Sequence, residues 1–392
     1  MKNESIIYFA KEWNQDRTSC DQVFDQLARQ NKVIWVNSIA MRNPNLASAH
    51  DLKRIFSKIR KCLGGLKQVG PTAWVLQPVV IPLPYSTFAQ KINQILLRGS
   101  IRRALVKLGM QNPQLWSFLP NTAYMVGQLN ESVVVYYCID EWASFSFYDS
   151  KKMVAMEQEL LRKADVCFAT AQSLLASRRQ SNPNTHLALH GVDFQHFARA
   201  LLPETVIPAD VSNLPRPIIG FFGMIHEWLD LDLIEKIADR HPEWSIVMIG
   251  KSMVNLDRFR ARTNVHLLGR RPYETLPAYC KAFDVATIPF LVNDLTRSVN
   301  PIKLREYLSA GLPVVSTDLP EVKHFGDLAM AAHTADEFIA QIEGGLQTNS
   351  PAERQRRSAA MAHETWEEKV YSVSNEVLKA KSQKHHATTS RL

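Results

Sequence analysis

Short apolar runs recur along this chain, and stretches with helical spacing separate them. An apolar run of four to eight residues fits a buried strand, and a helix between two such runs favours a parallel βαβ connection. The runs fall into two series, and four prolines between positions 203 and 217 separate the series. We therefore predict an α/β fold with two Rossmann-like βαβ domains that face each other across a cleft. Ligands of such sheets bind beyond the carboxyl ends of the strands.

The domain boundaries follow from this division. We predict an N-terminal domain over residues 1–200, a linker over 201–216 and a C-terminal domain over 217–365. Residues 366–392 are expected to form a terminal helix that packs back toward the N-terminal domain, plus a basic tail. The expected strands are 5–10, 32–37, 131–139, 166–170, 217–222, 244–249, 265–268, 285–289 and 314–317. The expected helices are 21–29, near 51–62, near 88–108, 231–238, 301–310 and 353–381.

The composition excludes several classes of protein. Apolar residues make up 46% and charged residues 21% of the 392 residues, which is typical of a globular protein rather than a disordered or fibrous one. The five scattered cysteines form no metal-ligand spacing and indicate reduced intracellular thiols. No apolar window is long enough to span a bilayer.

The charge is concentrated in one stretch. Between Asp51 and Glu131 there is no acidic residue, and there are eleven basic ones. Because the whole chain carries +8, the remaining residues sum to −3. A basic stretch can simply be a solvated helix face. However, Arg54, Lys58 and Lys61 alternate with apolar residues, which favours contact with an anionic membrane surface. No nucleic-acid-binding motif is present, so we expect no nucleic-acid partner.

The segment Ser298–Thr317 carries the most chemical information. Asn300 is a suitable N-cap, and Pro301 a suitable first helical residue. The start of the helix would present free N–H groups and a positive dipole to an anion, with the charge of Lys303 beside them. Glu306, one turn further on, could accept hydrogen bonds from the two hydroxyls of a ribose. Together these features suggest a nucleotide site, although an ordinary amphipathic helix would show the same spacing.

This segment resembles the donor-nucleotide motif of GT-B-fold glycosyltransferases of the retaining, family-4 type. The matching residues are Glu306, Ala310, Gly311, Pro313, Val314 and Val315, together with Pro301, Lys303 and Tyr307. Further segments that resemble this family are His190–Asp193, Ile219–Ile225, Leu268–Gly269, Asp284–Pro289 and Thr365–Glu367. The resemblance implies an N-terminal acceptor-side domain and a C-terminal domain that binds a nucleotide-sugar. It also implies retaining transfer, as in exopolysaccharide or cell-surface glycan synthesis, with no metal or other cofactor.

The chain departs from this family at three positions. Ser298 replaces the first glutamate of the motif, and Met224 and Leu229 replace an arginine and a lysine that bind the diphosphate. The missing charge could come from Lys303, Arg297, Lys251 or a protonated His226, which is also a catalytic candidate. The predicted donor-binding residues are Gly223, Lys251, Arg297, Ser298, Asn300, Pro301, Lys303 and Glu306.

Two acids follow the longest predicted strand of the first half. Asp140 and Glu141 are candidates for acceptor binding or acid–base catalysis, or else they are solvated loop acids. Arg17 follows the first strand and is a candidate acceptor or membrane contact. Asp230 and Asp232 have the D-x-D form of metal-dependent transferases, but acids are common at a helix start, so we predict no metal site.

Three functions fit these features. The first is a metal-independent glycosyltransferase that moves a sugar from a nucleotide-sugar to a membrane-associated, lipid-linked glycan acceptor. The others are a nucleotide-sugar epimerase of the same fold and a non-catalytic GT-B-like protein of a polysaccharide assembly complex. A cytoplasmic protein held peripherally on the inner face of the membrane is expected, and the sequence leaves its oligomeric state open.

Overall fold

The computed structural model describes residues 1–13, 15, 17–37, 39, 41 and 65–389. The predicted helix near 51–62, with Arg54, Lys58 and Lys61, lies outside the described residues. The chain forms two compact units. Unit 1 combines Met1–Leu189 with Lys369–Leu392, and unit 2 is His190–Glu368.

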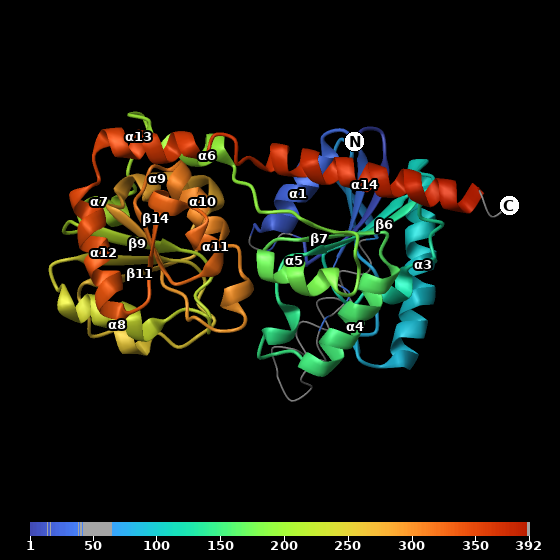
Figure 1. The fold of residues 1–392 in the computed structure, drawn as a ribbon, viewed down its shortest axis with the longest axis horizontal. Helices are drawn as coiled ribbons and strands as arrows, with labels where there is room; N and C mark the ends of the chain where they lie inside the picture. Colours follow the sequence, from blue (N-terminus) through green and yellow to red (C-terminus); the bar gives the residue numbers. More distant parts are fainter. Residues whose placement is uncertain (14, 16, 38, 40, 42–64, 390–392) are drawn as a thin grey trace. The chain divides into compact units, whose positions relative to one another are not determined.

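Unit 1 contains an eight-stranded sheet in the order β3-β4-β2-β1-β5-β6-β7-β8. All neighbouring pairs are parallel except β3 and β4, which are antiparallel. The strands are β1 Ser5–Phe9, β2 Lys32–Val36, β3 Leu66–Gly70, β4 Ala73–Leu76, β5 Gln114–Ser117, β6 Val133–Cys138, β7 Val166–Ala169 and β8 Thr185–Leu187. The helices of four or more residues between them are α1 Ser19–Ala28, α3 Thr87–Leu108, α4 Ser150–Lys163 and α5 Gln172–Arg179 (Figure 1).

The central strands of unit 1 are apolar along their whole length. All six residues of β6 are buried, and so are four of the five residues in β1 and in β2. Parallel strands that helices cover on both faces have this continuous pattern rather than an alternating one. The predicted strands that correspond to β1, β2, β6 and β7 are therefore confirmed.

The terminal helix α14, Trp366–Thr389, begins in unit 2 and continues in unit 1 (Figure 1). In unit 1, Lys381 forms an ion pair with Glu4 at 2.7 Å and Lys384 one with Asp165 at 2.8 Å. These two lysines fix the helix beside the start of β1 and of β7. Most of the residues predicted as a basic tail are therefore helical.

Unit 2 contains a six-stranded, wholly parallel sheet in the order β11-β10-β9-β12-β13-β14. The strands are β9 Ile218–Phe222, β10 Ser245–Ile249, β11 Val265–Gly269, β12 Val285–Ile288, β13 Val314–Thr317 and β14 Ala329–Ala332. The helices of unit 2 that have four or more residues are α6 Phe194–Ala198, α7 Ala209–Ser212, α8 Leu231–Arg240, α9 Leu276–Ala282, α10 Ile302–Ser309, α11 Pro320–Lys323, α12 Ala335–Gln347 and α13 Pro351–Ala360. They flank this sheet (Figure 1).

The structure divides the chain at other points than the sequence suggested. Residues 201–216, predicted as a linker, belong to unit 2, where Tyr279 and Arg271 both donate hydrogen bonds to the carboxylate of Asp210. The single helix predicted over 353–381 is wrong, because α13 and α14 are separate. Between them, Val192 donates a backbone hydrogen bond of 2.8 Å to Glu364, and this pairing interrupts the helix.

None of the described helices is long and apolar enough to cross a membrane.

Candidate functional site

Two glycine turns lie side by side at the carboxyl ends of β9 and β10. Gly223 follows β9 with a φ of +146°, and Gly250 follows β10 with a φ of +151°. Residues with a side chain rarely adopt such angles. A Cβ on Gly250 would lie 1.7 Å from the carbonyl oxygen of Gly223. Only glycine allows the two backbones to approach this closely.

Lys303 covers the turn at Gly223. A Cβ on Gly223 would lie 2.0 Å from Cε and 2.8 Å from Nζ of Lys303. The ammonium group therefore lies directly beside the backbone that follows β9. A positive charge at a glycine turn, at the carboxyl end of a parallel strand, is an arrangement suited to phosphate groups.

Helix α10 brings Lys303 and Glu306 to this edge. The tyrosine that follows Glu306 fixes the helix, because the Tyr307 hydroxyl accepts a hydrogen bond of 2.8 Å from the backbone N–H of Phe222 at the end of β9. Tyr307 is fully buried. No local sequence pattern assigns Tyr307 this role, because its partner is 85 residues away.

The predicted cap of α10 is wrong. Pro301, not Asn300, occupies the N-cap position, and the helix begins at Ile302. The side chain of Asn300 instead accepts a hydrogen bond of 2.8 Å from Nη1 of Arg305, and Nε of Arg305 donates to Glu364 at 3.0 Å. Asn300 therefore supports the base of the helix.

Lys303 and Glu306 are both desolvated. Glu306 is 9% exposed, and burial raises the pKa of its carboxyl from 4.5 to about 7, although the charge of Lys303 opposes this. Burial also lowers the pKa of Lys303. Neither side chain makes a hydrogen bond or an ion pair within 4 Å with any residue that the structure describes. A buried acid and a half-buried base that form no hydrogen bond or ion pair among the described residues are typical of a site that a ligand completes.

In unit 1, the two acids that follow β6 have different surroundings. Glu141 forms a two-point ion pair with Arg178, with contacts of 2.6 Å and 2.8 Å. Asp140 is half-buried, and burial together with the charge of Glu141 raises its pKa to about 7. The geometry gives Glu141 a structural contact, whereas Asp140 has the pKa of a general acid or base that works near neutrality.

Comparisons with known proteins show which proteins the chain resembles. Residues 216–348 match the family model described as "Glycosyl transferases group 1". The putative teichuronic acid biosynthesis glycosyltransferase TuaH of Bacillus subtilis (strain 168) is 26% identical over 260 residues, 60% of this chain and 64% of TuaH. The match thus spans less than two thirds of that relative.

Solved structures resemble the chain over nearly its whole length. The sucrose-phosphate synthase of Thermosynechococcus elongatus has a TM-score of 0.67 at 14% identity, over 95% of this chain and 98% of that one. HepE of Anabaena, in complex with UDP and glucose, has a TM-score of 0.63 at 12% identity, over 99% of this chain and 100% of that one. At these identities the likeness shows the fold.

The chain has a GT-B fold, and its residues 216–348 resemble the group 1 glycosyltransferases. The predicted fold class and the predicted family resemblance are both confirmed.

The other candidate donor residues lie around the same edge of the glycosyltransferase domain. Lys251 directly follows Gly250 and is exposed, and its carbonyl oxygen accepts a hydrogen bond of 3.0 Å from Ile225. Arg297 is exposed and Ser298 is buried in the short turn before α10. Their roles as donor contacts stay predictions.

His226 is not suited to supply the missing charge. Its ring stacks on Trp228 with the centroids 4.2 Å apart, and burial lowers its pKa despite the neighbouring Glu227. The roles of His226 as a protonated donor contact and as a catalytic residue stay predictions, and the lowered pKa does not favour the first of them. Leu229 is buried in the core of the domain, and Met224 is exposed, so neither takes the place of the missing arginine and lysine.

The D-x-D acids of this domain have structural partners. Asp230 caps α8 by accepting a hydrogen bond of 2.8 Å from the backbone of Leu233, and Asp232 contacts Arg258 at 2.6 Å. In the described part of the chain, no cluster of three or more His, Cys, Asp or Glu side chains could hold a metal ion.

In unit 1, Arg17 contacts residues of the adjacent helix α1. It donates hydrogen bonds to Gln22 at 3.2 Å and to Asp25 at 2.7 Å, both on α1. The position of Arg17 as an acceptor or membrane contact stays a prediction.

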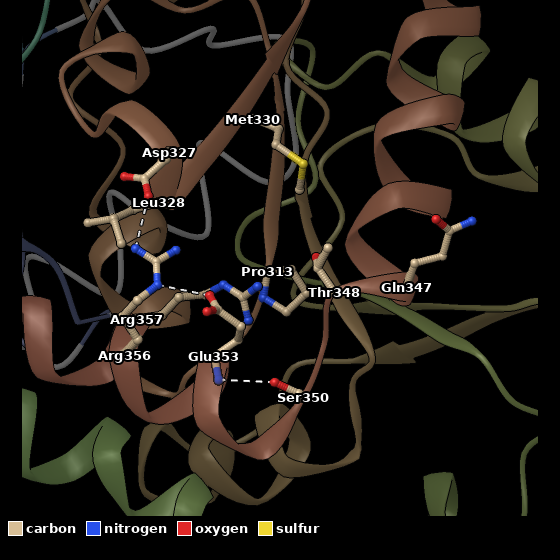
Figure 2. Close-up of a pocket in the computed structure, with 10 residues that line it drawn as sticks. All are labelled: Pro313, Asp327, Leu328, Met330, Gln347, Thr348, Ser350, Glu353, Arg356 and Arg357. Atoms are coloured by element: carbon tan, nitrogen blue, oxygen red, sulfur yellow. Dashed lines mark hydrogen bonds and ion pairs between the residues drawn. The ribbon is translucent and has the colours of Figure 1, made fainter.

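A cavity of about 440 Å³ lies at the opposite end of the glycosyltransferase domain. It opens at the amino ends of β13 and β14, where Figure 2 shows Arg356 between Asp327 and Glu353, each at 2.9 Å. The donor motif lies at the carboxyl ends of the strands, so this cavity is separate from it.

Two features of the site were missed from the sequence. Gly250 ends a strand as Gly223 does, and this shared position was a signal that could have identified it. Arg178 carried no such signal, because it lies 37 residues from Glu141.

Proposed function

We propose that this protein is a retaining, metal-independent glycosyltransferase that moves a sugar from a nucleotide-sugar to a membrane-associated, lipid-linked glycan acceptor. One observation carries the proposal: the Lys303 ammonium lies beside the glycine turn after β9, with the desolvated Glu306 one helical turn further on. A diphosphate and a ribose on one nucleotide would satisfy both side chains.

Each residue has a defined part in this reaction. Lys303 binds the diphosphate and stabilises the negative charge that grows on it as the sugar leaves. The Glu306 carboxylate accepts hydrogen bonds from the ribose hydroxyls and so orients the nucleotide. Asp140 binds the acceptor hydroxyl on unit 1. As the bond between the sugar and the phosphate breaks and the new glycosidic bond forms on the same face of the sugar, the leaving phosphate takes up the proton of that hydroxyl.

The relatives indicate which substrates to try first. HepE was solved with UDP, with UDP-glucose and with UDP and glucose, so UDP-sugars come first among the donors. The name of TuaH assigns it to teichuronic acid synthesis, which supports a cell-surface glycan as the acceptor class. The concentrated basic charge between Asp51 and Glu131 supports an acceptor held on an anionic membrane.

Donor binding tests the assignment of the site. Calorimetric titration with UDP-, GDP-, ADP- and dTDP-sugars should identify one donor class. Lys303→Met should weaken its binding by about 10- to 100-fold, because a hydrogen bond to a charged group contributes about 1.5–3 kcal/mol. Glu306→Ala should have an effect of similar size. Lys236→Met, at an exposed position on α8, is the matched control and should bind normally.

Turnover then separates the candidate functions. Nucleotide release that depends on a lipid extract supports the transferase. Conversion of the nucleotide-sugar without any acceptor would support an epimerase, and binding without turnover would support a non-catalytic protein. If Lys303→Met and Glu306→Ala both bind the donor as the wild type does, the proposed site is wrong.

A further inference from the structure

The outer face of α3 carries a line of apolar side chains in water. Phe88 is 72% exposed, Ile95 60% and Val106 82%. Steps of seven and eleven residues correspond to about two and three helical turns, so the three side chains lie on one line along the helix. Gly99, also on this line, adds no side chain that would interrupt it.

Folding does not require this line. The inner face of α3 has its own apolar residues, and Leu97, Ile101 and Leu105 are buried in the core of unit 1. The helix is therefore apolar on two opposite faces, and only one of them has a protein partner in the described residues. Isolated exposed apolar side chains are ordinary, but an aligned series on one helix marks an interaction surface.

Basic residues flank the apolar line on both sides. At 100° per residue, Lys91, Arg98 and Arg102 lie on one side of it, and Arg103 and Lys107 on the other. The helix has no acidic residue. Among the residues that the structure describes, none of the five bases forms an ion pair, since Arg102 and Arg103 contact only backbone carbonyls.

This arrangement fits one kind of partner. Long basic side chains beside an apolar stripe can extend to lipid phosphates while the apolar groups enter the acyl region. A nucleic acid would leave the apolar line unsatisfied, and an apolar protein groove would leave five charges without counter-charges. We propose that α3 lies flat on an anionic membrane with Phe88, Ile95 and Val106 inserted between the lipids.

The inference names the membrane partner of the proposed function and rests on that function for its biological setting. The sequence-based prediction placed the membrane contact on the acid-free stretch between Asp51 and Glu131, with Arg54, Lys58 and Lys61 as its named residues, and that prediction stays untested. These three residues lie outside the described part of the chain. The contact surface proposed here consists wholly of described residues.

Sedimentation with vesicles tests the surface. The wild type should bind vesicles rich in phosphatidylglycerol at physiological salt and should bind phosphatidylcholine vesicles hardly at all. The charge variant Arg102→Glu, Arg103→Glu and Lys107→Glu should bind at least about 100-fold more weakly, since each of the three bases contributes about fivefold in affinity. The apolar variant Phe88→Ser, Ile95→Ser and Val106→Ser should bind more than about tenfold more weakly at high salt, where insertion rather than charge holds the protein.

A matched control variant distinguishes the effect of where the charges lie from the effect of the change in net charge. Lys236→Glu, Arg260→Glu and Lys323→Glu change the net charge equally at exposed sites of unit 2 and should leave vesicle binding within about threefold of the wild type. Equal losses in the control and in the α3 charge variant would overturn the inference. So would α3 variants that bind vesicles as the wild type does, or that change only the oligomeric mass in solution.

Donor titration on the same samples keeps the two proposals distinct. The α3 variants should bind the donor nucleotide normally, because α3 belongs to unit 1 and the donor motif to unit 2. Normal vesicle binding with no donor binding in the wild type would overturn the proposed function alone. Normal donor binding with no vesicle binding in the wild type would overturn the membrane surface alone.

Discussion

Two clusters of charged side chains, one in each unit, differ in whether their charges are paired. In unit 1, Arg178 lies between Glu141 and Glu157, with contacts of 2.6 to 2.8 Å to each carboxylate, and Glu157 also accepts a hydrogen bond from Tyr136. In unit 2, Lys303 and Glu306 are desolvated and have no such partners among the described residues. The first cluster is complete by itself, whereas the second is not.

This difference distinguishes structural charges from functional ones. Removing charges from water is costly, and a folded chain normally compensates by pairing them. Burial raises the pKa of Glu306 toward neutrality and lowers that of Lys303, so both side chains are held in a state that is unfavourable without a ligand. A cost of this kind is expected where binding, rather than folding, has shaped the residues.

The largest expected effect comes from breaking the complete cluster. Arg178→Met should leave two carboxylates in unit 1 without their counter-charge, and this should lower the free energy of unfolding by about 3–5 kcal/mol. Urea denaturation at pH 7 measures the change. Arg162→Met, at an exposed position on α4, is the control and should change stability by less than about 0.5 kcal/mol. A loss below about 1 kcal/mol for Arg178→Met would mean that the cluster is not structural.

Altering the incomplete cluster, Lys303 and Glu306, should change the free energy of unfolding in the opposite direction. The pKa of Glu306 is about 7 in the folded protein against 4.5 ordinarily, so between these values the folded chain holds a proton that the unfolded chain has lost. The free energy of unfolding therefore falls as the pH rises through this window. Glu306→Gln should remove this loss and stabilise the protein by up to about 3 kcal/mol at pH 8, with little change at pH 4.

The matched substitution in unit 1 completes this test. Glu141→Gln removes a charge that Arg178 needs, so it should destabilise the protein at pH 8. The same chemical change should thus stabilise one unit and destabilise the other. If Glu306→Gln also destabilises the protein at pH 8, Glu306 has a structural role and the contrast between the two clusters disappears.

The sequence was sufficient to predict strands and motifs that depend on residues adjacent along the chain. Strands with continuous apolar runs, such as β6 and β9, were recognised, whereas β5, with the sequence QLWS, and β14, with AMAA, are too short and too weakly apolar to stand out. Gly223, Lys303 and Glu306 could be proposed because the motif around α10 is local. The pairing of Arg178 with Glu141 depends on how α5 meets the end of β6, which no local pattern encodes.

Burial decided the remaining predictions about the site. The sequence allowed a protonated His226 because a histidine can carry a charge near neutrality. Partial burial lowers the pKa of His226. Both this burial and the stacking of the ring on Trp228 are consequences of tertiary packing. Asn300 likewise is a residue type that commonly caps helices, but its side chain accepts a hydrogen bond from Arg305 instead. The residue type limits which interactions a side chain can form, and the residues packed around it determine which of these interactions forms.

The smallest expected effect is on the pH dependence of donor binding. The ionised Glu306 carboxylate accepts hydrogen bonds from both ribose hydroxyls more strongly than the protonated carboxyl does, because both of its oxygens share the negative charge. With a pKa of about 7, donor affinity should rise about tenfold between pH 6 and pH 8, and binding at pH 6 should release close to one proton. Calorimetric titration in two buffers with different heats of ionisation measures both quantities.

Two variants assign this proton to its residue. Glu306→Gln should bind more weakly and with no pH dependence over the same range, because its amide does not titrate. Asp140→Asn removes the other carboxyl with a pKa of about 7, and it should keep the wild-type slope because Asp140 belongs to unit 1. A wild-type affinity that is flat from pH 6 to pH 8, or a slope that survives in Glu306→Gln, would show that the incomplete cluster does not bind the ribose.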